Sequence, residues 1–320
     1  MKNLVLFSGL ILALFLPSAK AQTPTYTNEF GFRSDNDAYL AYGQDRYYTN
    51  GLFITFRHAA DQSSLNAKVI KRIWEIEAGQ KMFNAISGYV ADVSKVDRPF
   101  AGYLYGGGSM NWLYTNESNL KLSLELGTIG PSSLGEKGQV LLHDLVGFYD
   151  IQGWESQVKD ELGINAKIEY NRLLYRASSL KNDFTLTSKA RLGNTFSGAG
   201  VGLFFRSGII NQLFNSASTA STLSNNSKTE ALNEREFFFY AEPSLSYVAY
   251  DATTEGGLFR DDKGPVTFDV KPLVFSQQLG VMYAKKRWTL DFSAIFKSRE
   301  IKSDAKAHQY GSAAIYYRFN

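Results

Sequence analysis

The chain has 320 residues, with 34 basic and 31 acidic side chains and no cysteine. The absence of cysteine excludes a disulfide framework, cysteine-ligated zinc, iron–sulfur clusters and a thiol nucleophile. Without a 21-residue leader, which contains Lys2, Lys20 and no acid, 32 basic and 31 acidic side chains remain, and this balance excludes a broad basic surface for nucleic acid. A mean hydropathy of −0.23 without a long apolar run excludes a helical membrane protein but not a membrane β-barrel.

The N-terminal segment predicts a secretory signal peptide over residues 1–21. A basic start is followed by an apolar run over residues 4–16 and by the small-residue cleavage site Ala19-Lys20-Ala21. The apolar run is too short to span a bilayer as a helix. We expect cleavage before Gln22, which leaves residues 22–320 as one domain.

Apolar and polar residues alternate along much of the remaining chain. Leucines at alternate positions of the stretch 120–126 are separated by Lys121, Ser123 and Glu125, and the stretch 288–297 alternates in the same way. This pattern indicates β-strands, because successive side chains of a strand point to opposite faces. A soluble β-sandwich would alternate as well, so the pattern alone leaves the fold class open.

Strand length and aromatic placement favour a membrane barrel. Charged residues lie on one face of strands that reach the roughly 10 residues needed to cross a membrane. Aromatic residues gather near strand ends, as at Trp112 and Tyr114, where an interfacial girdle would lie. The chain ends on a strand with Phe319 one residue before the C terminus, as outer-membrane barrels of Gram-negative bacteria commonly do. We predict an all-β transmembrane antiparallel barrel of about twelve strands with one short extracellular helix.

An even number of strands suits a single-chain barrel. The predicted strands are 25–34, 48–58, 72–83, 102–115, 119–130, 161–175, 182–193, 200–208, 235–249, 267–284, 287–299 and 308–319. If both termini are periplasmic, the tight turns 115–119 and 285–287 are periplasmic too. The longer connections then lie outside; they are 35–47, 84–101, 131–160, 250–266 and 300–307. The polar stretch 215–234 fits badly, because it lies at the periplasmic end, where turns are short. Either it is an unusual loop or a strand near 182–208 is wrongly predicted.

Four polar clusters lie at the extracellular end of the barrel by strand count alone. They are Asp35-Asn36-Asp37 and the segments 45–51, 97–102 and 130–143. They are spread over more than a hundred residues of sequence, and scattered surface residues would have no reason to share one end. We therefore expect a functional site there.

The segment 132–147 is the one helix that the sequence predicts. Ser133 and Glu136 have the spacing of a capping box. The predicted apolar face comprises Leu134, Leu141, Leu142, Leu145 and Val146. Gln139 and His143, four residues apart, share another face. An imidazole beside an amide suits a general base that activates water, although a lone histidine is more often a hydrogen-bonded loop residue.

The other polar residues of these clusters each allow two interpretations. Asn36 and Asp37 offer oxygen ligands for a hard cation such as calcium, but a run of Asx residues also forms turns. Thr49 could orient a water molecule or cap a turn. Arg98 could hold a phosphate through its guanidinium group or form an ion pair with Asp97. No G-x-S-x-G, P-loop or H-E-x-x-H motif is found.

Taken in order, these clusters resemble the outer-membrane lipid A 3′-O-deacylase family. The matching segments are Asn36-Asp37, Asp45-Arg46, Tyr48-Thr49-Asn50-Gly51, Arg98-Pro99-Phe100-Ala101-Gly102, Gly130-Pro131-Ser132, Gln139-x3-His143 and Gly153-Trp154-x2-Gln157-x3-Glu161. The resemblance extends from about Phe30 to the C terminus. Three positions depart from the family pattern. Asp35 stands where the family has Glu, and Phe100 stands where Tyr is usual. Asn84, which follows the segment 79–83, stands where the family more often has Thr-Pro. The register of Asn36-Asp37 is open by one residue, so Asp35 is an alternative metal group.

The resemblance implies hydrolysis of the 3′-linked acyloxyacyl ester of lipid A, with calcium as cofactor. It implies that His143 is the general base, that Gln139 positions the base or the water, and that Asn36 and Asp37 lie at the metal and oxyanion site. It places Thr49 beside them and, less firmly, Arg98 on a lipid A phosphate.

Lipopolysaccharide in the outer membrane is then the expected partner, nucleic acid is not, and a monomer is expected. Two alternatives stay open. One is a barrel esterase that acts on another lipid. The other is a non-enzymatic barrel that serves as a pore or a surface-binding protein.

Overall fold

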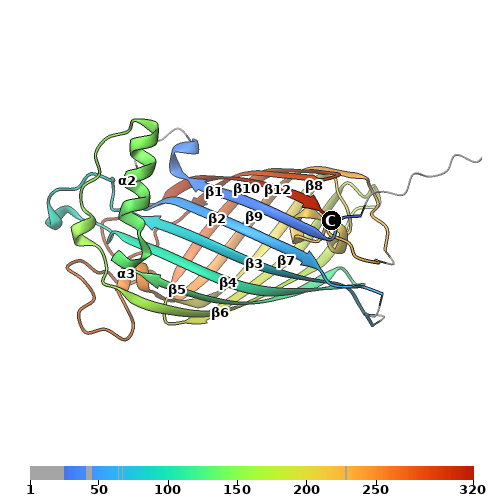
Figure 1. The fold of residues 1–320 in the computed structure, drawn as a ribbon, viewed down its shortest axis with the longest axis horizontal. Coiled ribbons are helices and arrows are strands. Elements are labelled where there is room, and N and C mark those ends of the chain that lie inside the picture. Colours follow the sequence, from blue (N-terminus) through green and yellow to red (C-terminus); the bar gives the residue numbers. More distant parts are fainter. Residues whose placement is uncertain (1–24, 41–44, 64, 67, 228) are drawn as a thin grey trace, which may run out of the picture.

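The computed structural model describes residues 25–40, 45–63, 65–66, 68–227 and 229–320. The predicted signal peptide lies outside the described residues. Within them, twelve antiparallel strands form a closed barrel in which neighbours in sequence pair and β1 (Asn28–Asn36) pairs with β12 (His308–Phe319) (Figure 1). None of the helices in this part of the chain has the length and apolar character to cross a membrane. The predicted fold class is confirmed.

Each predicted strand overlaps one observed strand. The remaining strands are β2 (Tyr48–Ala59), β3 (Val69–Phe83), β4 (Ala101–Tyr114), β5 (Ser118–Ile129), β6 (Glu161–Arg176), β7 (Asn182–Gly193), β8 (Phe196–Ile209), β9 (Arg235–Asp251), β10 (Leu273–Lys285) and β11 (Trp288–Lys297). The largest error is at β10, which begins six residues after the predicted start at residue 267. The short helices are η2 (Asp37–Leu40), η3 (Val93–Lys95), η4 (Pro131–Ser133), α2 (Gly135–Val146), η5 (Trp154–Ser156), η6 (Leu213–Asn215), η7 (Ala217–Thr219) and α3 (Ala252–Glu255).

The alternation of side chains separates an apolar outer surface from a charged interior. On β5, Leu122, Leu124 and Leu126 are exposed on the outer face, whereas Lys121 and Glu125 line an interior cavity of about 600 Å³. The interior charges are paired with one another. Glu75 on β3, for example, accepts hydrogen bonds from Arg57 at 2.5 Å and from Lys121 at 2.7 Å. Such pairing offsets the cost of removing these charges from bulk water.

The predicted helix over 132–147 is present as η4 followed by α2, but the predicted capping box is wrong. Ser133 belongs to the 3-10 turn, and its hydroxyl donates to the Gly130 carbonyl at 2.5 Å. Leu134, with φ of 58°, then separates the two helices and takes the N-cap position of α2. Ser133 is therefore one residue too early to cap α2.

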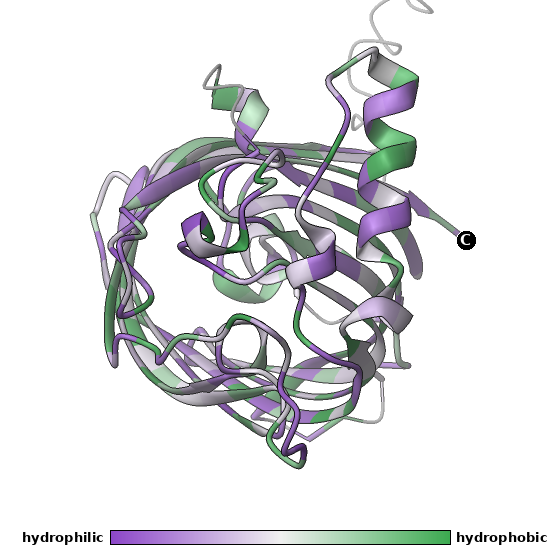
Figure 2. Ribbon diagram, turned by 90° about the vertical axis from the view of Figure 1, so that its left-hand side faces the viewer, coloured by the Kyte–Doolittle hydropathy of each residue, from purple (hydrophilic) through white to green (hydrophobic). Residues whose placement is uncertain are grey.

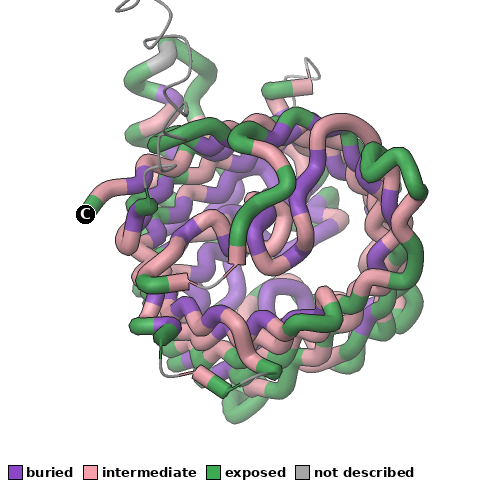
Figure 3. Tube along the Cα trace, turned by 90° about the vertical axis from the view of Figure 1, so that its right-hand side faces the viewer, coloured by how far each residue is buried: buried purple, intermediate pink, exposed green. Residues whose placement is uncertain are grey.

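The polar connection between β8 and β9 folds back into the barrel at the end opposite to α2 (Figures 1 and 3). The Lys71 ammonium donates to the Ser221 carbonyl at 2.8 Å, and the Asn111 amide donates to the Thr219 carbonyl at 3.1 Å. Leu213 and Leu223 are buried. The predicted strands around 182–208 are thus correct. The stretch 215–234 is an unusual loop that folds into the barrel interior and does not extend outward from its end.

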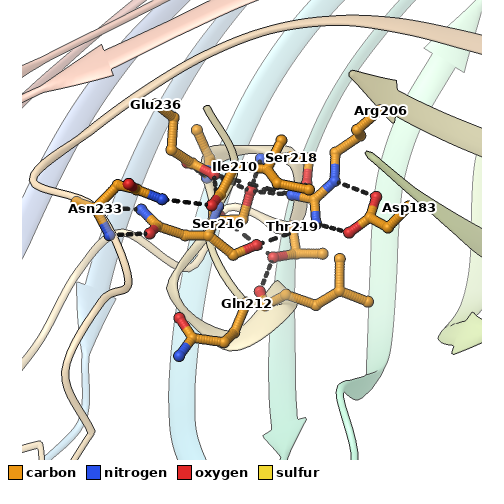
Figure 4. Close-up of polar contacts among 12 residues, drawn as sticks. Asp183, Arg206, Ile210, Gln212, Ser216, Ser218, Thr219, Asn233 and Glu236 are labelled. Carbon is orange, nitrogen blue, oxygen red and sulfur yellow. Dashed lines mark hydrogen bonds and ion pairs between the residues drawn. The ribbon is translucent and has the colours of Figure 1, made fainter. Parts of the chain in front are cut away.

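A buried network joins this loop to the barrel wall (Figure 4). The Arg206 guanidinium donates from Nε and Nη2 to the two carboxylate oxygens of Asp183, at 2.9 and 2.6 Å. Its Nη1 donates to the Ser216 hydroxyl at 2.7 Å, and that hydroxyl donates to Glu236 at 2.8 Å. One arginine thus links β7, β8 and β9 to the inserted loop.

We expect Arg206→Ala to lower the free energy of unfolding by about 3 kcal/mol, because it leaves buried carboxylates with fewer partners. Thermal unfolding in detergent, read as the shift between folded and unfolded bands on a gel, measures this change. Arg235→Ala is the matched control, since Arg235 is an exposed arginine at the start of β9. Equal melting temperatures for the two variants would contradict the prediction.

Candidate functional site

All four polar clusters lie at the end of the barrel that carries α2. Figure 2 looks onto this end and shows α2 standing beside the mouth, against the wall and not across the opening. The helix packs on β3 and β4. Gln139 and His143 are buried on its barrel side, whereas Leu141 and Leu145 are 59% and 73% exposed. The predicted apolar stripe of this helix therefore points away from the barrel, and the polar pair points toward it.

Two glycines allow α2 to approach the wall. A Cβ atom on Gly135 would lie 2.9 Å from the Gly102 Cα atom and 2.7 Å from Cη2 of Trp154. On the strand side, a Cβ on Gly102 would lie 3.0 Å from the Gly135 Cα atom. Gly135 weakens the helix intrinsically, but it is what brings Gln139 and His143 against β3 and β4.

We expect Gly135→Ala to displace the start of α2 from the wall while the barrel stays folded. Limited proteolysis should then cut within residues 131–160 faster than in the wild type, with an unchanged melting temperature of the barrel. Gly147→Ala is the comparison at the other end of the helix. A Cβ atom there would meet no atom within 4 Å, although the positive φ of 72° would strain the alanine backbone. Cleavage as slow as in the wild type for Gly135→Ala would contradict the close-packing argument.

His143 is held by two groups on opposite sides of its ring. Its Nδ1 lies 2.8 Å from the Tyr149 carbonyl oxygen, and its Nε2 lies 3.2 Å from Oδ2 of Asp45. A carbonyl oxygen can only accept, so Nδ1 carries the hydrogen and the Nε2 of the neutral ring has a free lone pair. The ring also packs edge-on against Tyr149, with centroids 5.0 Å apart. This geometry suits a general base.

Gln139 lies one helical turn before His143 and is completely buried. Its Oε1 accepts a hydrogen bond from the Trp154 indole at 2.9 Å. Its Nε2 has no hydrogen-bond partner within the described part of the chain. The indole fixes the amide so that its nitrogen keeps two hydrogens available to donate.

Asp37 and Thr49 meet beside the acidic partner of His143. The Thr49 hydroxyl lies 3.0 Å from Oδ1 of Asp45 and 3.3 Å from Oδ1 of Asp37. The Arg46 backbone N–H donates to Asp37 at 2.6 Å. Burial, with a further contribution from the charge of Asp45, raises the pKa of Asp37 to about 6. The structure thus brings Asp37, Thr49 and His143 together through Asp45.

Asn36 and Asp35 occupy different positions around this group. The Asn36 amide donates to Asn50 at 2.5 Å, and its oxygen accepts from the Ala38 N–H at 2.6 Å, which is an Asx turn. Asp35 lines the interior cavity and accepts from the Tyr48 hydroxyl at 2.7 Å. The two aspartates differ because β1 ends at Asn36: Asp35 is still in the strand, whereas Asp37 begins η2 and lies beside Thr49.

Arg98 also faces the interior. It is buried, donates to the Thr253 hydroxyl at 2.9 Å and to the Pro99 carbonyl at 3.1 Å, and stacks over the Phe83 ring at 4.3 Å. These contacts and its place in the cavity wall separate it from the group around His143.

Sequence reasoning assigned no role to Asp45, Tyr149 or Trp154. Asp45 and Trp154 lie within the segments that carry the family resemblance, so the sequence indicates that these positions matter but does not predict what they contact. Tyr149 had no such signal. It reaches His143 because the chain reverses at Gly147, where φ is 72°.

The oxygen atoms around Asp37 fit a calcium ion chemically. Asp37 forms no ion pair with a basic side chain within the described residues, and its raised pKa shows a carboxylate that a cation would stabilise in its charged form. The described ranges contain no group of three or more histidine, cysteine or carboxylate side chains that could hold a metal. Hydroxyl, amide or water oxygens, including those of Thr49 and Asn36, would have to complete the coordination.

We expect Asp37→Asn to change stability in a pH-dependent way when calcium is chelated. The folded protein disfavours the charged carboxylate, so the wild type loses stability as pH rises from about 4, the usual Asp pKa, to about 6, its pKa in the fold. The difference in melting temperature between Asp37→Asn and the wild type should grow across that window and be constant above it. A difference that is the same at pH 4 and pH 7 would contradict the raised pKa.

The chain matches known proteins over nearly its whole length. The model of the family described as "Outer membrane protein LpxR" matches residues 6–319. Among solved structures, LpxR from Salmonella typhimurium superposes with a TM-score of 0.70 at 19% identity, covering 91% of this chain and 100% of that one. The beta domain of the Bordetella autotransporter BrkA superposes with a TM-score of 0.50 at 12% identity, covering 92% and 100%. No curated protein sequence matches. At these identities the structural matches show the shared barrel fold.

Proposed function

The chain belongs to the LpxR family of outer membrane proteins, and on this premise we propose that it is a lipid A 3′-O-deacylase whose active site faces the cell exterior. The observation that carries the proposal is His143. This buried imidazole lies on the side of α2 that faces the barrel wall, with a hydrogen on Nδ1 and a lone pair on Nε2, close to a carboxylate and to a polar group that fits calcium.

In the proposed reaction, Nε2 of His143 takes a proton from a water molecule, whose oxygen attacks the ester carbonyl carbon. The carbon–oxygen bond to the sugar then breaks, and the imidazolium returns the proton to the 3′-oxygen. Since no group within the described residues accepts from the Gln139 amide nitrogen, we assign this nitrogen as a donor to the water or to the carbonyl oxygen. The Thr49 hydroxyl holds Asp37, and the Asn36 amide ties the end of β1 to Asn50.

Calcium, when bound by Asp37 with Asn36 or Thr49, would supply positive charge to stabilise the negative charge that develops on the carbonyl oxygen. The contribution of the chain is to bring these oxygen atoms together beside the base.

One feature weighs against the pore alternative. The loop 215–234 inside the barrel disfavours a pore, because it occupies the interior at the end opposite to the site. Arg98, which lines the interior, is proposed as a phosphate contact only if lipid A reaches over the barrel mouth. An esterase for another lipid would use the same groups and differs in substrate alone.

The proposal is tested by mass spectrometry of lipid A from cells that express the wild type or His143→Ala, with calcium or with chelator. We expect the wild type with calcium to remove one acyloxyacyl group from the 3′ position, and the variant to lose activity by at least about 10²-fold, the contribution of a general base. His58→Gln is the matched control, since His58 lies on the strand β2 away from α2.

Unchanged lipid A with a folded, surface-exposed wild type would reject the proposed substrate. Cleavage of phospholipids in the same cells would then support the esterase alternative. If phospholipids were unchanged as well, a non-enzymatic barrel would be favoured.

A further inference from the structure

We propose that Tyr149 positions the base, and that Asp45, which Tyr149 holds, supplies the opposite charge for the imidazolium that forms when Nε2 of His143 takes a proton. The inference rests on the proposed hydrolytic function and assigns two residues to it. Neither residue is a donor of the oxyanion site or a cation ligand in the scheme above.

Tyr149 acts on both nitrogen atoms of the His143 ring, directly at Nδ1 and through Asp45 at Nε2. Its backbone carbonyl accepts from Nδ1 at 2.8 Å. Its phenol donates to Oδ2 of Asp45, the same oxygen that lies 3.2 Å from Nε2. One residue thus sets the tautomer of the imidazole and orients the carboxylate that faces its other nitrogen.

Asp45 itself is fixed before any substrate arrives. Its side chain is buried and its Oδ1 lies 3.0 Å from the Thr49 hydroxyl. Its backbone has φ of 42°, an uncommon conformation for a residue with a side chain, and its carbonyl accepts from the Asn84 amide at 3.2 Å. A strained backbone held by several partners is typical of functional sites.

The chemistry explains why the partner is a carboxylate. An ionised carboxylate only accepts hydrogen bonds, so it leaves the Nε2 lone pair unoccupied while the ring is neutral. When Nε2 takes the proton of the attacking water, the imidazolium gains an opposite charge at ion-pair distance. Asp45 therefore stabilises the protonated ring that the reaction creates, while the Tyr149 carbonyl holds the neutral ring at Nδ1, and no additional proton or co-reactant is needed.

This role predicts that Asp45→Asn lowers activity more than Asp45→Ala does, the reverse of the order expected for a merely structural residue. In Asp45→Asn, an amide oxygen that keeps the hydrogen bond from Thr49 leaves the amide nitrogen in the place of Oδ2, where it faces both Nε2 and the Tyr149 phenol oxygen. That nitrogen donates to the lone pair and blocks the base. In Asp45→Ala the lone pair stays free, and only the opposite charge beside the imidazolium is lost.

We expect kcat for ester cleavage to fall about 10-fold in Asp45→Ala and about 10²-fold or more in Asp45→Asn, with KM changed little in both. Tyr149→Phe keeps the carbonyl and the ring and should resemble Asp45→Ala. Asp97→Asn is the matched control, because Asp97 accepts from the Tyr47 hydroxyl at 2.7 Å at the same end of the barrel but contacts no histidine. A merely structural role gives the opposite order, since Asn preserves more contacts than Ala.

Three outcomes would overturn the inference. They are activity of Asp45→Asn at or above that of Asp45→Ala, a KM effect without a kcat effect, and recovery of Asp45→Asn by excess calcium, which would make Asp45 a cation ligand. If the wild type cleaves no lipid, the proposed function fails, and the inference is decided by a second measurement.

That measurement is the rate at which diethyl pyrocarbonate modifies His143, read by peptide mass spectrometry with His58 and His308 as internal references. The reagent attacks a free imidazole lone pair, and Nδ1 is engaged with the Tyr149 carbonyl. We expect slower modification of His143 in Asp45→Asn than in Asp45→Ala. Equal rates would reject the positioning role whether or not the protein is a deacylase.

Discussion

Closure of the barrel by the pairing of β1 with β12 is the constraint on which the site depends. A membrane leaves no unpaired strand edge without cost, so the sheet has to close. With neighbours in sequence also neighbours in space, every second connection then lies at the same end. Asp37, Thr49 and His143 meet for this reason, although the first and last are more than a hundred residues apart.

The packing of α2 on the wall depends on a second constraint, the absence of side chains where the two touch. Gly102 and Gly135 let a helix that is weak by itself lie directly against a strand. The helix then places its two polar residues in a buried space and leaves its leucines exposed at the rim. An inward-facing imidazole, an amide with a free nitrogen and a carboxylate pair follow from that contact, and they supply the proposed hydrolytic chemistry.

At the opposite end of the barrel, hydrogen bonds and ion pairs among buried charged residues hold the inserted loop in the interior. Arg206 satisfies Asp183 and reaches the inserted loop in one network, and Lys71 holds the same loop from β3. For that reason the loop is part of the folded interior, and hydrogen-bonded networks lie at both ends of the barrel.

By itself, the sequence determined the strands, because the two-residue period of a strand is local and needs no knowledge of distant contacts. Strand length, aromatic residues at the strand ends and the C-terminal strand then favoured a barrel over a sandwich. The sequence also determined the end at which Asn36, Asp37, Thr49, Gln139 and His143 lie, since strand parity needs only a count. Only the tertiary structure decided which of Asp35 and Asp37 faces Thr49, where Arg98 points and that Ser133 does not cap α2, because each depends on a register or a turn that shifts by one residue. The sequence did not predict the contacts of His143 with Asp45 and Tyr149 for a related reason: a carboxylate in the connection before β2 and a chain that reverses after Gly147 meet only once the barrel has closed and the helix has docked.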